Sequence, residues 1–231
     1  MLLLGHRGDC RAAPENTIAA FDVAIRNGCD GFEFDVRLTA DFRAVVVHDA
    51  KISGVAVNTN TFGRLQELDA SREPRYCLPR FEEVVARYAD SAFLDIELKV
   101  PGLDSIVIAQ LKRFPPRRGY LVSSFQPQLL LAIAKQDSTI PLGLIAADRR
   151  MLSRWRELPL KYVIPKYPLV RTELVEECHR MGRKLFAWTV NGIRTMRRMA
   201  ELGVDGIISD DTKLLVETLK KAGSRGPPRT I

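Results

Sequence analysis

The chain alternates short apolar runs with longer amphipathic segments. Runs rich in Val, Ile and Leu recur along its length, and apolar positions at helical spacing follow each of them. This alternation is typical of the β-α units that build a parallel sheet. The runs predicted to be strands are 2–6, 32–36, 92–98, 120–124, 141–146, 161–165, 185–190 and 206–210.

The first amphipathic segment shows why these stretches are predicted to be helical. Ile18, Phe21 and Ile25 recur at the spacing of one helix face. Asn16 or Thr17 can cap the start of this helix, because a short polar side chain can accept a hydrogen bond from a free backbone N–H group. The first helix is therefore expected to begin about ten residues after the first strand ends.

One apolar run breaks the alternation. AVVVHD at 44–49 follows VRLT at 36–39 after only about four turn residues, whereas a parallel crossover needs a dozen or more. We therefore expect 31–39 and 44–48 to form an antiparallel hairpin. Eight β-α units then remain, which predicts a TIM (β/α)8 barrel with a small insertion after the second-strand hairpin.

The domain organisation follows from this count. A single domain is predicted over 1–222, with about 50–80 as the small insertion over the barrel mouth and 223–231 as a flexible tail. The opening MLLLG is too short for the core of a signal peptide, and no window reaches the roughly 18 apolar residues of a membrane span. We expect a cytoplasmic protein without stable membrane association.

Composition narrows the partners only slightly. Apolar residues make up 46% and charged residues 27% of the chain, which is ordinary for a globular protein. The net charge of +7 favours anionic partners, including nucleic acids and phosphorylated small molecules. The chain has four cysteines without a C-x-x-C pair, which indicates free thiols rather than a zinc site or disulfides. They are Cys10, Cys29, Cys77 and Cys178.

Polar side chains gather where the predicted strands end. In a TIM barrel the active site lies at the carboxyl ends of the strands, so these positions are the candidates for chemistry. They are His6, Arg7, Glu33, Asp35, Asp95, Glu97, Lys99, Ser123, Ser124, Phe125, Lys166, Trp188, Thr189, Asn191, Ser209 and Asp210.

Three carboxylates are predicted to meet at the barrel mouth. Successive strand residues face opposite sides, so Glu33 and Asp35 point the same way, and Glu97 lies near the end of a later strand. Such a group repels itself unless a cation lies among its members, and oxygen ligands favour Mg²⁺ or Ca²⁺. The alternative is simple ion pairing of single carboxylates with Arg7 or Lys99.

Two of the three histidines accompany these carboxylates. His6 ends the first strand, and the predicted hairpin returns His48 beside Asp35. Two imidazoles that flank a bound group suit proton removal and proton donation near neutral pH. Arg7 and Lys99 add the positive charge that holds a phosphate. Together these residues predict hydrolysis of a phosphodiester.

The motifs that contain these residues resemble the glycerophosphodiester phosphodiesterase family. They keep the family's order over nearly the whole chain: GHRG at 5–8, PENTIAAF at 14–21, GFEFDVRLTAD at 31–41, VVVHD at 45–49, IELK at 96–99, SSF at 123–125, WTVN at 188–191 and GVDGIISD at 203–210. The resemblance implies a TIM barrel that hydrolyses glycerophosphodiesters to sn-glycerol 3-phosphate and an alcohol. It also implies one divalent cation, Mg²⁺ or Ca²⁺.

The resemblance assigns three kinds of role. The metal ligands are Glu33, Asp35 and Glu97; the acid/base pair is His6 and His48; the substrate-binding residues are Arg7, Lys99, Phe125 and Trp188. Phe125 and Trp188 would pack against the glycerol or its exit path. The resemblance leaves open which histidine is the base, and whether water or the glycerol 2-hydroxyl attacks first.

The chain departs from the family pattern in two places. Its segment 49–74 lacks the Arg-Thr-Thr cluster of many members, which leaves the preferred head group open. Asp95 stands where a neutral Asn is common, and this adds a charge beside the predicted metal. Lys166 has no family role, Glu15 is expected to complement the first helix, and His179 is expected to have no partner.

Three alternatives accompany the phosphodiesterase hypothesis. A lysophospholipase D-like or phospholipase C-like enzyme on the same fold would need an apolar rim, and Ile52, Val55, Val57 and Phe62 are the candidates for it. A basic nucleic-acid-binding module is disfavoured, because the basic clusters lack interleaved aromatic residues. A catalytically silent barrel is disfavoured because every motif residue is retained. A small-molecule glycerophosphodiester is the expected partner, and the oligomeric state is left open.

Overall fold

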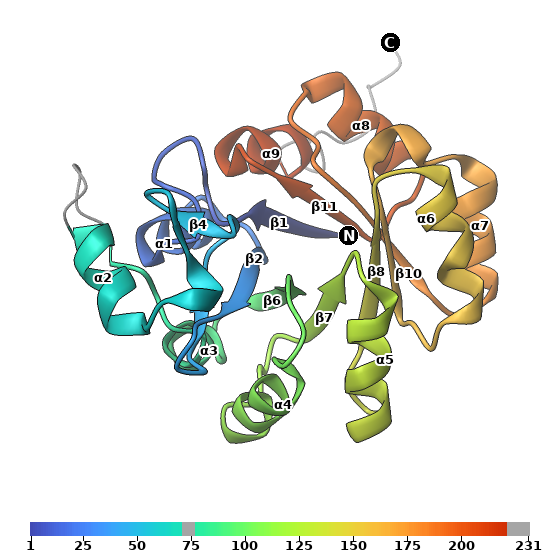
Figure 1. Cartoon of the computed structure of the whole chain (residues 1–231). Coiled ribbons are helices and arrows are strands. Elements are labelled where there is room, and N and C mark those ends of the chain that lie inside the picture. Colours follow the sequence, from blue (N-terminus) through green and yellow to red (C-terminus); the bar gives the residue numbers. More distant parts are fainter. Residues whose placement is uncertain (71–76, 221–231) are drawn as a thin grey trace, which may run out of the picture.

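The computed structural model describes residues 1–70 and 77–220. Eight parallel strands form a closed barrel, because β1 pairs with both β11 and β2 (Figure 1). These strands are β1 (Leu2–His6), β2 (Gly31–Leu38), β6 (Phe93–Leu98), β7 (Tyr120–Ser124), β8 (Leu142–Ala146), β9 (Tyr162–Pro165), β10 (Lys184–Ala187) and β11 (Gly206–Ser209). The predicted (β/α)8 barrel is confirmed. The predicted tail, 223–231, lies outside the described residues.

Helices surround the strands on the outside of the barrel (Figure 1). They are α1 (Ile18–Arg26), α2 (Phe62–Ala70), α3 (Phe81–Tyr88), α4 (Asp104–Arg113), α5 (Pro127–Gln136), α6 (Arg149–Ser153), α7 (Thr172–Arg180), α8 (Ile193–Glu201) and α9 (Thr212–Leu219). Of the two cap candidates for α1, the structure selects Thr17, whose Oγ1 accepts a hydrogen bond of 3.2 Å from the N–H of Ala20. Asn16 is thereby free for another contact.

Two apolar layers stabilise the barrel. The larger one lies between the strands and the surrounding helices, and the stacked rings of Phe21 and Phe32, 4.2 Å apart, belong to it. The smaller one fills the barrel interior, as expected for this fold. It consists of Leu4, Phe93, Leu121, Ile145, Tyr162, Ile164, Phe186 and Ile208. The polar strand ends therefore stand above a packed apolar floor.

The predicted hairpin determines the course of the loop that carries His48. β3 (Ala44–Val46) pairs antiparallel with the last residues of β2, on the edge whose first residues pair with β1. Val46 lies opposite Val36, and the N–H of Val47 donates to the carbonyl of Asp35. The chain after β3 therefore runs back along β2 toward the end of β1.

The insertion has a small core of its own. It contains β4 (Lys51–Ile52), β5 (Val55–Ala56), a 3-10 turn (Val57–Thr59) and α2. Ile52 and Val57, two of the candidates for an apolar rim, are buried there instead, because they pack with Val45, Leu65 and Leu78. No helix in the described ranges is long and apolar enough to span a bilayer.

Candidate active site

The loop after β1 carries two residues in the left-handed backbone region. Arg7 has φ of 56° and Asn16 has φ of 59°, which is uncommon outside glycine and is typical of functional sites. The N–H of Arg7 donates to Glu33 Oε2 at 3.0 Å. Asn16 exchanges two hydrogen bonds with Asp35, through its side-chain amide and the Asp35 N–H. The strained loop thus orients two predicted metal ligands.

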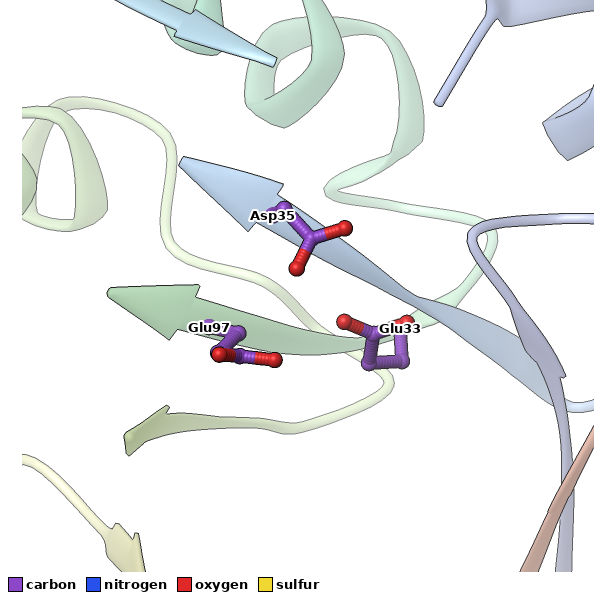
Figure 2. A group of neighbouring side chains, drawn as sticks. All are labelled: Glu33, Asp35 and Glu97. Carbon is purple, nitrogen blue, oxygen red and sulfur yellow. The ribbon is translucent and has the colours of Figure 1, made fainter. Parts of the chain in front are cut away.

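Four carboxylates occupy neighbouring positions on β2 and β6. In the parallel register Glu33 lies opposite Asp95, and Asp35 lies opposite Glu97. All four residues are buried. One carboxylate oxygen from each of Glu33, Asp35 and Glu97 lies within 4.8 Å of the other two, and the three side chains point toward the same space (Figure 2). The structure thus brings the predicted ligands together.

Burial and mutual repulsion shift the pKa values of these acids in different directions. Burial, together with the charges of Asp35 and Glu97, raises the pKa of Glu33 well above its usual range. Burial also raises the pKa of Glu97 to about 8. Asp35 is buried too, but the positive charges of Lys99 and Arg7 outweigh this and lower its pKa. The group is therefore short of positive charge around Glu33 and Glu97.

This arrangement fits a hard divalent cation. Lys99 Nζ lies 2.7 Å from Glu97 Oε1 and 3.2 Å from Asp35 Oδ1, so ion pairing contributes as well. It does not account for Glu33, whose buried Oε1 has no hydrogen-bond partner. Three converging carboxylates with a free buried oxygen suit Mg²⁺ or Ca²⁺, which prefer oxygen ligands.

His6 is held by a network that links the first and last strands. Its Nδ1 lies 2.6 Å from Asp210 Oδ1, and its Nε2 lies 4.0 Å from Glu33 Oε2. Asp210 in turn accepts a hydrogen bond from the amide of Asn191, and the N–H of Asp210 donates to Asn191 Oδ1. These contacts hold the imidazole with its Nε2 toward the carboxylates, an orientation that a bound acceptor at Nδ1 commonly fixes.

His48 approaches from the hairpin and is held more loosely. Its side chain is 34% exposed, against 19% for His6. Its Nδ1 lies 2.8 Å from Asp49 Oδ1, a carboxylate that is 75% exposed. The Nε of Arg37 donates to the backbone carbonyl of His48 and ties the loop to β2. Both histidines thus border the carboxylate group, and they reach it along the same edge of β2.

A cavity of about 190 Å³ lies beside the carboxylate group and between the two histidines. It is lined by His6, Arg7, Glu33, His48, Asp95, Glu97, Lys99, Phe125, Ile145, Ile164, Trp188 and Ile208. Phe125 and Trp188 stack edge to face at 5.4 Å, and Trp188 Nε1 donates to the Ile164 carbonyl. The opening is therefore charged on one side and apolar on the other.

Four side chains make supporting contacts in the site that were not predicted. Asn191 and Asp210 were noted only as polar strand ends, and Asn16 only as a possible helix cap. Glu15, expected to complement the first helix, instead accepts two hydrogen bonds from Arg7 Nη1, at 3.0 and 2.9 Å. The available signal for Asp210 was its place as the last residue of the predicted strand 206–210.

Two further predictions lie outside the cavity. The expectation that His179 has no partner is wrong, because its Nε2 lies 2.9 Å from Asp205 Oδ2. Lys166 has an exposed side chain that does not line the cavity, and the structure gives it no role.

Comparison with known proteins settles the family. The model of the glycerophosphoryl diester phosphodiesterase family matches residues 6–214. The chain belongs to this family. A glycerophosphodiester phosphodiesterase of Caldanaerobacter subterraneus subsp. tengcongensis is 34% identical over 241 residues, which cover 96% of this chain and 99% of that protein. One from Bacillus altitudinis is 32% identical over 229 residues, covering 90% and 94%.

Solved structures of the family share the fold. A Thermotoga maritima glycerophosphodiester phosphodiesterase aligns with a TM-score of 0.81 at 25% identity, covering 94% of this chain and 97% of that one. An Oleispira antarctica phosphodiesterase, determined with the product sn-glycerol-3-phosphate, aligns with a TM-score of 0.84 at 24% identity, covering 95% and 97%. Family membership confirms the predicted enzyme class, a hydrolase of glycerophosphodiesters.

Proposed function

We propose that this family member hydrolyses glycerophosphodiesters to sn-glycerol 3-phosphate and an alcohol, with a divalent cation and with His6 and His48 as the acid/base pair. One observation carries the proposal: three buried carboxylates converge beside a cavity, and two of them, Glu33 and Glu97, line it together with two imidazoles and two cationic side chains. Glu33, Asp35 and Glu97 would hold the cation. Bound there, Mg²⁺ or Ca²⁺ would supply positive charge to the phosphate oxygens.

Arg7 and Lys99 bind and orient the phosphate in this proposal. Both line the cavity and both lie against the carboxylates, so they present their charge at its polar side. Arg7 is steadied by Glu15 on its far side. Charge-assisted hydrogen bonds of this kind are the stronger ones in proteins. The two residues thereby hold the diester with its phosphorus between the two histidines.

The histidines share the proton transfers. One imidazole removes a proton from the attacking hydroxyl, of water or of the glycerol 2-hydroxyl, as its oxygen bonds to phosphorus. The other donates a proton to the alcohol oxygen as the P–O bond to the alcohol breaks, so the proton count balances. When the 2-hydroxyl attacks, the product of this step is a cyclic phosphate. Water then opens its P–O bond to the 2-oxygen, with the two imidazoles in exchanged roles, and gives sn-glycerol 3-phosphate. Asp210 keeps Nδ1 of His6 occupied, so that Nε2 is the atom that exchanges the proton. Phe125 and Trp188 pack against the glycerol carbons.

Chelation tests the proposal directly. We expect EDTA to abolish the release of sn-glycerol 3-phosphate from glycerophosphoethanolamine, and added Mg²⁺ or Ca²⁺ to restore it. Calorimetry on the metal-free protein should show that Glu97→Gln weakens cation binding, because one charged ligand is lost. Glu157→Gln, at an exposed position on the 3-10 turn Arg154–Glu157, is the matched control and should bind normally. Hydrolysis that survives thorough chelation would refute the role of the cation.

A further inference from the structure

A second cavity of about 180 Å³ lies on the other side of His48. It is lined by Pro14, Glu15, Asn16, Thr17, Val46, Val47, His48, Asp49, Lys51, Ile52, Cys77, Leu78 and Pro79. We call it the outer groove. His48 is the one described residue that lines both this groove and the catalytic cavity. His48 therefore borders both spaces.

The two histidines differ in what lies behind them. In phosphoryl transfer the attacking and leaving oxygens lie roughly in line on opposite sides of phosphorus. His6 is backed by Asp210 and Asn191 and does not line the outer groove. His48 opens onto that groove. An alcohol that departs past His48 has the outer groove beside it, whereas behind His6 lie Asp210 and Asn191.

The groove has an apolar floor and a charged rim. Val46, Ile52 and Leu78 are buried beneath it. A carboxylate stands on each wall: Glu15 on the β1–α1 loop, with 46% of its side chain exposed, and the still more exposed Asp49 after β3. Such a site suits a short aliphatic chain that ends in a hydrogen-bonding cation.

The lining also discriminates between cations. None of its described residues is Phe, Tyr or Trp. A quaternary ammonium group is recognised chiefly by aromatic faces, whereas a primary ammonium group donates hydrogen bonds to carboxylates. Lys51 is the one Lys or Arg side chain in the described lining, and it is exposed. Of the two carboxylates, Glu15 is also paired with Arg7, and Asp49 also lies against His48.

We propose that the outer groove is the head-group subsite, that it takes a small primary ammonium alcohol such as ethanolamine rather than a trimethylammonium one, and that His48 protonates the leaving oxygen. This inference rests on the proposed function.

The test of this inference compares kcat/KM for two diesters of sn-glycerol 3-phosphate: the ethanolamine diester, which reaches the groove, and the methyl diester, which does not. The wild-type protein should also hydrolyse the ethanolamine diester roughly tenfold faster in kcat/KM than the choline diester.

A variant that fills the groove separates the two proposals. Cys77 is exposed on the groove and does not line the catalytic cavity. Cys77→Trp should lower kcat/KM roughly tenfold for the ethanolamine diester and leave the methyl diester unchanged. Leu131→Trp, at an exposed site on α5, is the bulk-matched control and should alter neither. If the wild type hydrolyses neither diester, the proposed function fails. If Cys77→Trp affects both diesters equally, or neither, the subsite fails.

A charge variant supplies an independent measurement should Cys77→Trp fold poorly. Removing the cation with Lys51→Met should raise kcat/KM for the ethanolamine diester about threefold at low ionic strength, and high salt should erase this gain. The methyl diester should show no change. A gain shared by both diesters, or a wild-type preference for choline, would overturn the assignment of a primary ammonium group.

Discussion

The two sides of the catalytic cavity differ in the chemistry of their side chains. The side formed by β1, β2, β6 and the end of β3 concentrates charged groups. The opposite side, formed by β7 to β11, presents Phe125, Ile145, Ile164, Trp188 and Ile208. The charged side holds groups that burial leaves incompletely neutralised, such as Glu33. On the apolar side the indole N–H of Trp188 is satisfied, because it donates a hydrogen bond to the Ile164 carbonyl.

This difference indicates that the charged side of the cavity serves catalysis and the apolar side serves substrate binding. Buried carboxylates that repel one another either take up a proton or are stabilised as charged groups by a cation or a ligand. The buried charged groups of this cavity are therefore expected to act in catalysis. Apolar side chains gain their free energy from any carbon surface that covers them. Substitutions on the charged side should thus act on kcat, and substitutions on the apolar side should act on KM.

The largest expected effect is on the charged side. His6→Ala and His48→Ala should each lower kcat by at least about 100-fold, the usual cost of losing an acid/base catalyst. Asp210→Asn keeps the imidazole but removes its charged partner, so kcat should fall less and its pH profile should move. Initial-rate kinetics between pH 5 and 9 measure all three. Near-normal turnover in either alanine variant would remove that histidine from the mechanism.

The sequence predicted the charged side well for a physical reason. Side chains two residues apart on one strand share a face, so Glu33 and Asp35 could be paired from spacing alone. The hairpin followed from a turn too short for a parallel crossover, and this placed His48. The eight strands were found because each buried run is bounded by a change in periodicity.

The contacts that the sequence did not disclose join distant parts of the chain. His6 and Asp210 are 204 residues apart and meet only because β11 closes the barrel against β1. Asn16 looked like a helix cap, and only its left-handed backbone turns the amide toward Asp35. The burial of Ile52 in the insertion core depends on packing with Leu65, which no local pattern specifies.

A smaller effect is expected on the apolar side. Trp188→Ala removes a ring that packs against Phe125 at the cavity opening. We expect KM for glycerophosphoethanolamine to rise about tenfold, as for the loss of one to two kcal/mol of apolar contact, while kcat changes less than threefold. Steady-state kinetics measure both constants. A fall in kcat comparable with that of His6→Ala would contradict this division, because it would place Trp188 in catalysis as well as in substrate binding.

The smallest expected effect concerns Asp95 and is measured as stability rather than turnover. Asp95 lies opposite Glu33, accepts a hydrogen bond from Ser123 on β7, and is outside the three-carboxylate group. Burial raises its pKa from the ordinary 3.8 to about 7. A raised carboxyl pKa means that the folded state binds the proton more tightly, so stability is lost as pH rises through this range.

Asp95→Asn removes this pH-dependent loss of stability. The Tm of the metal-free variant should exceed that of the wild type by about 3 °C or more at pH 8, and by less at pH 5. Calorimetric scans in EDTA measure this. An equal Tm at pH 8 would show that the charge of Asp95 is already compensated in the folded wild type.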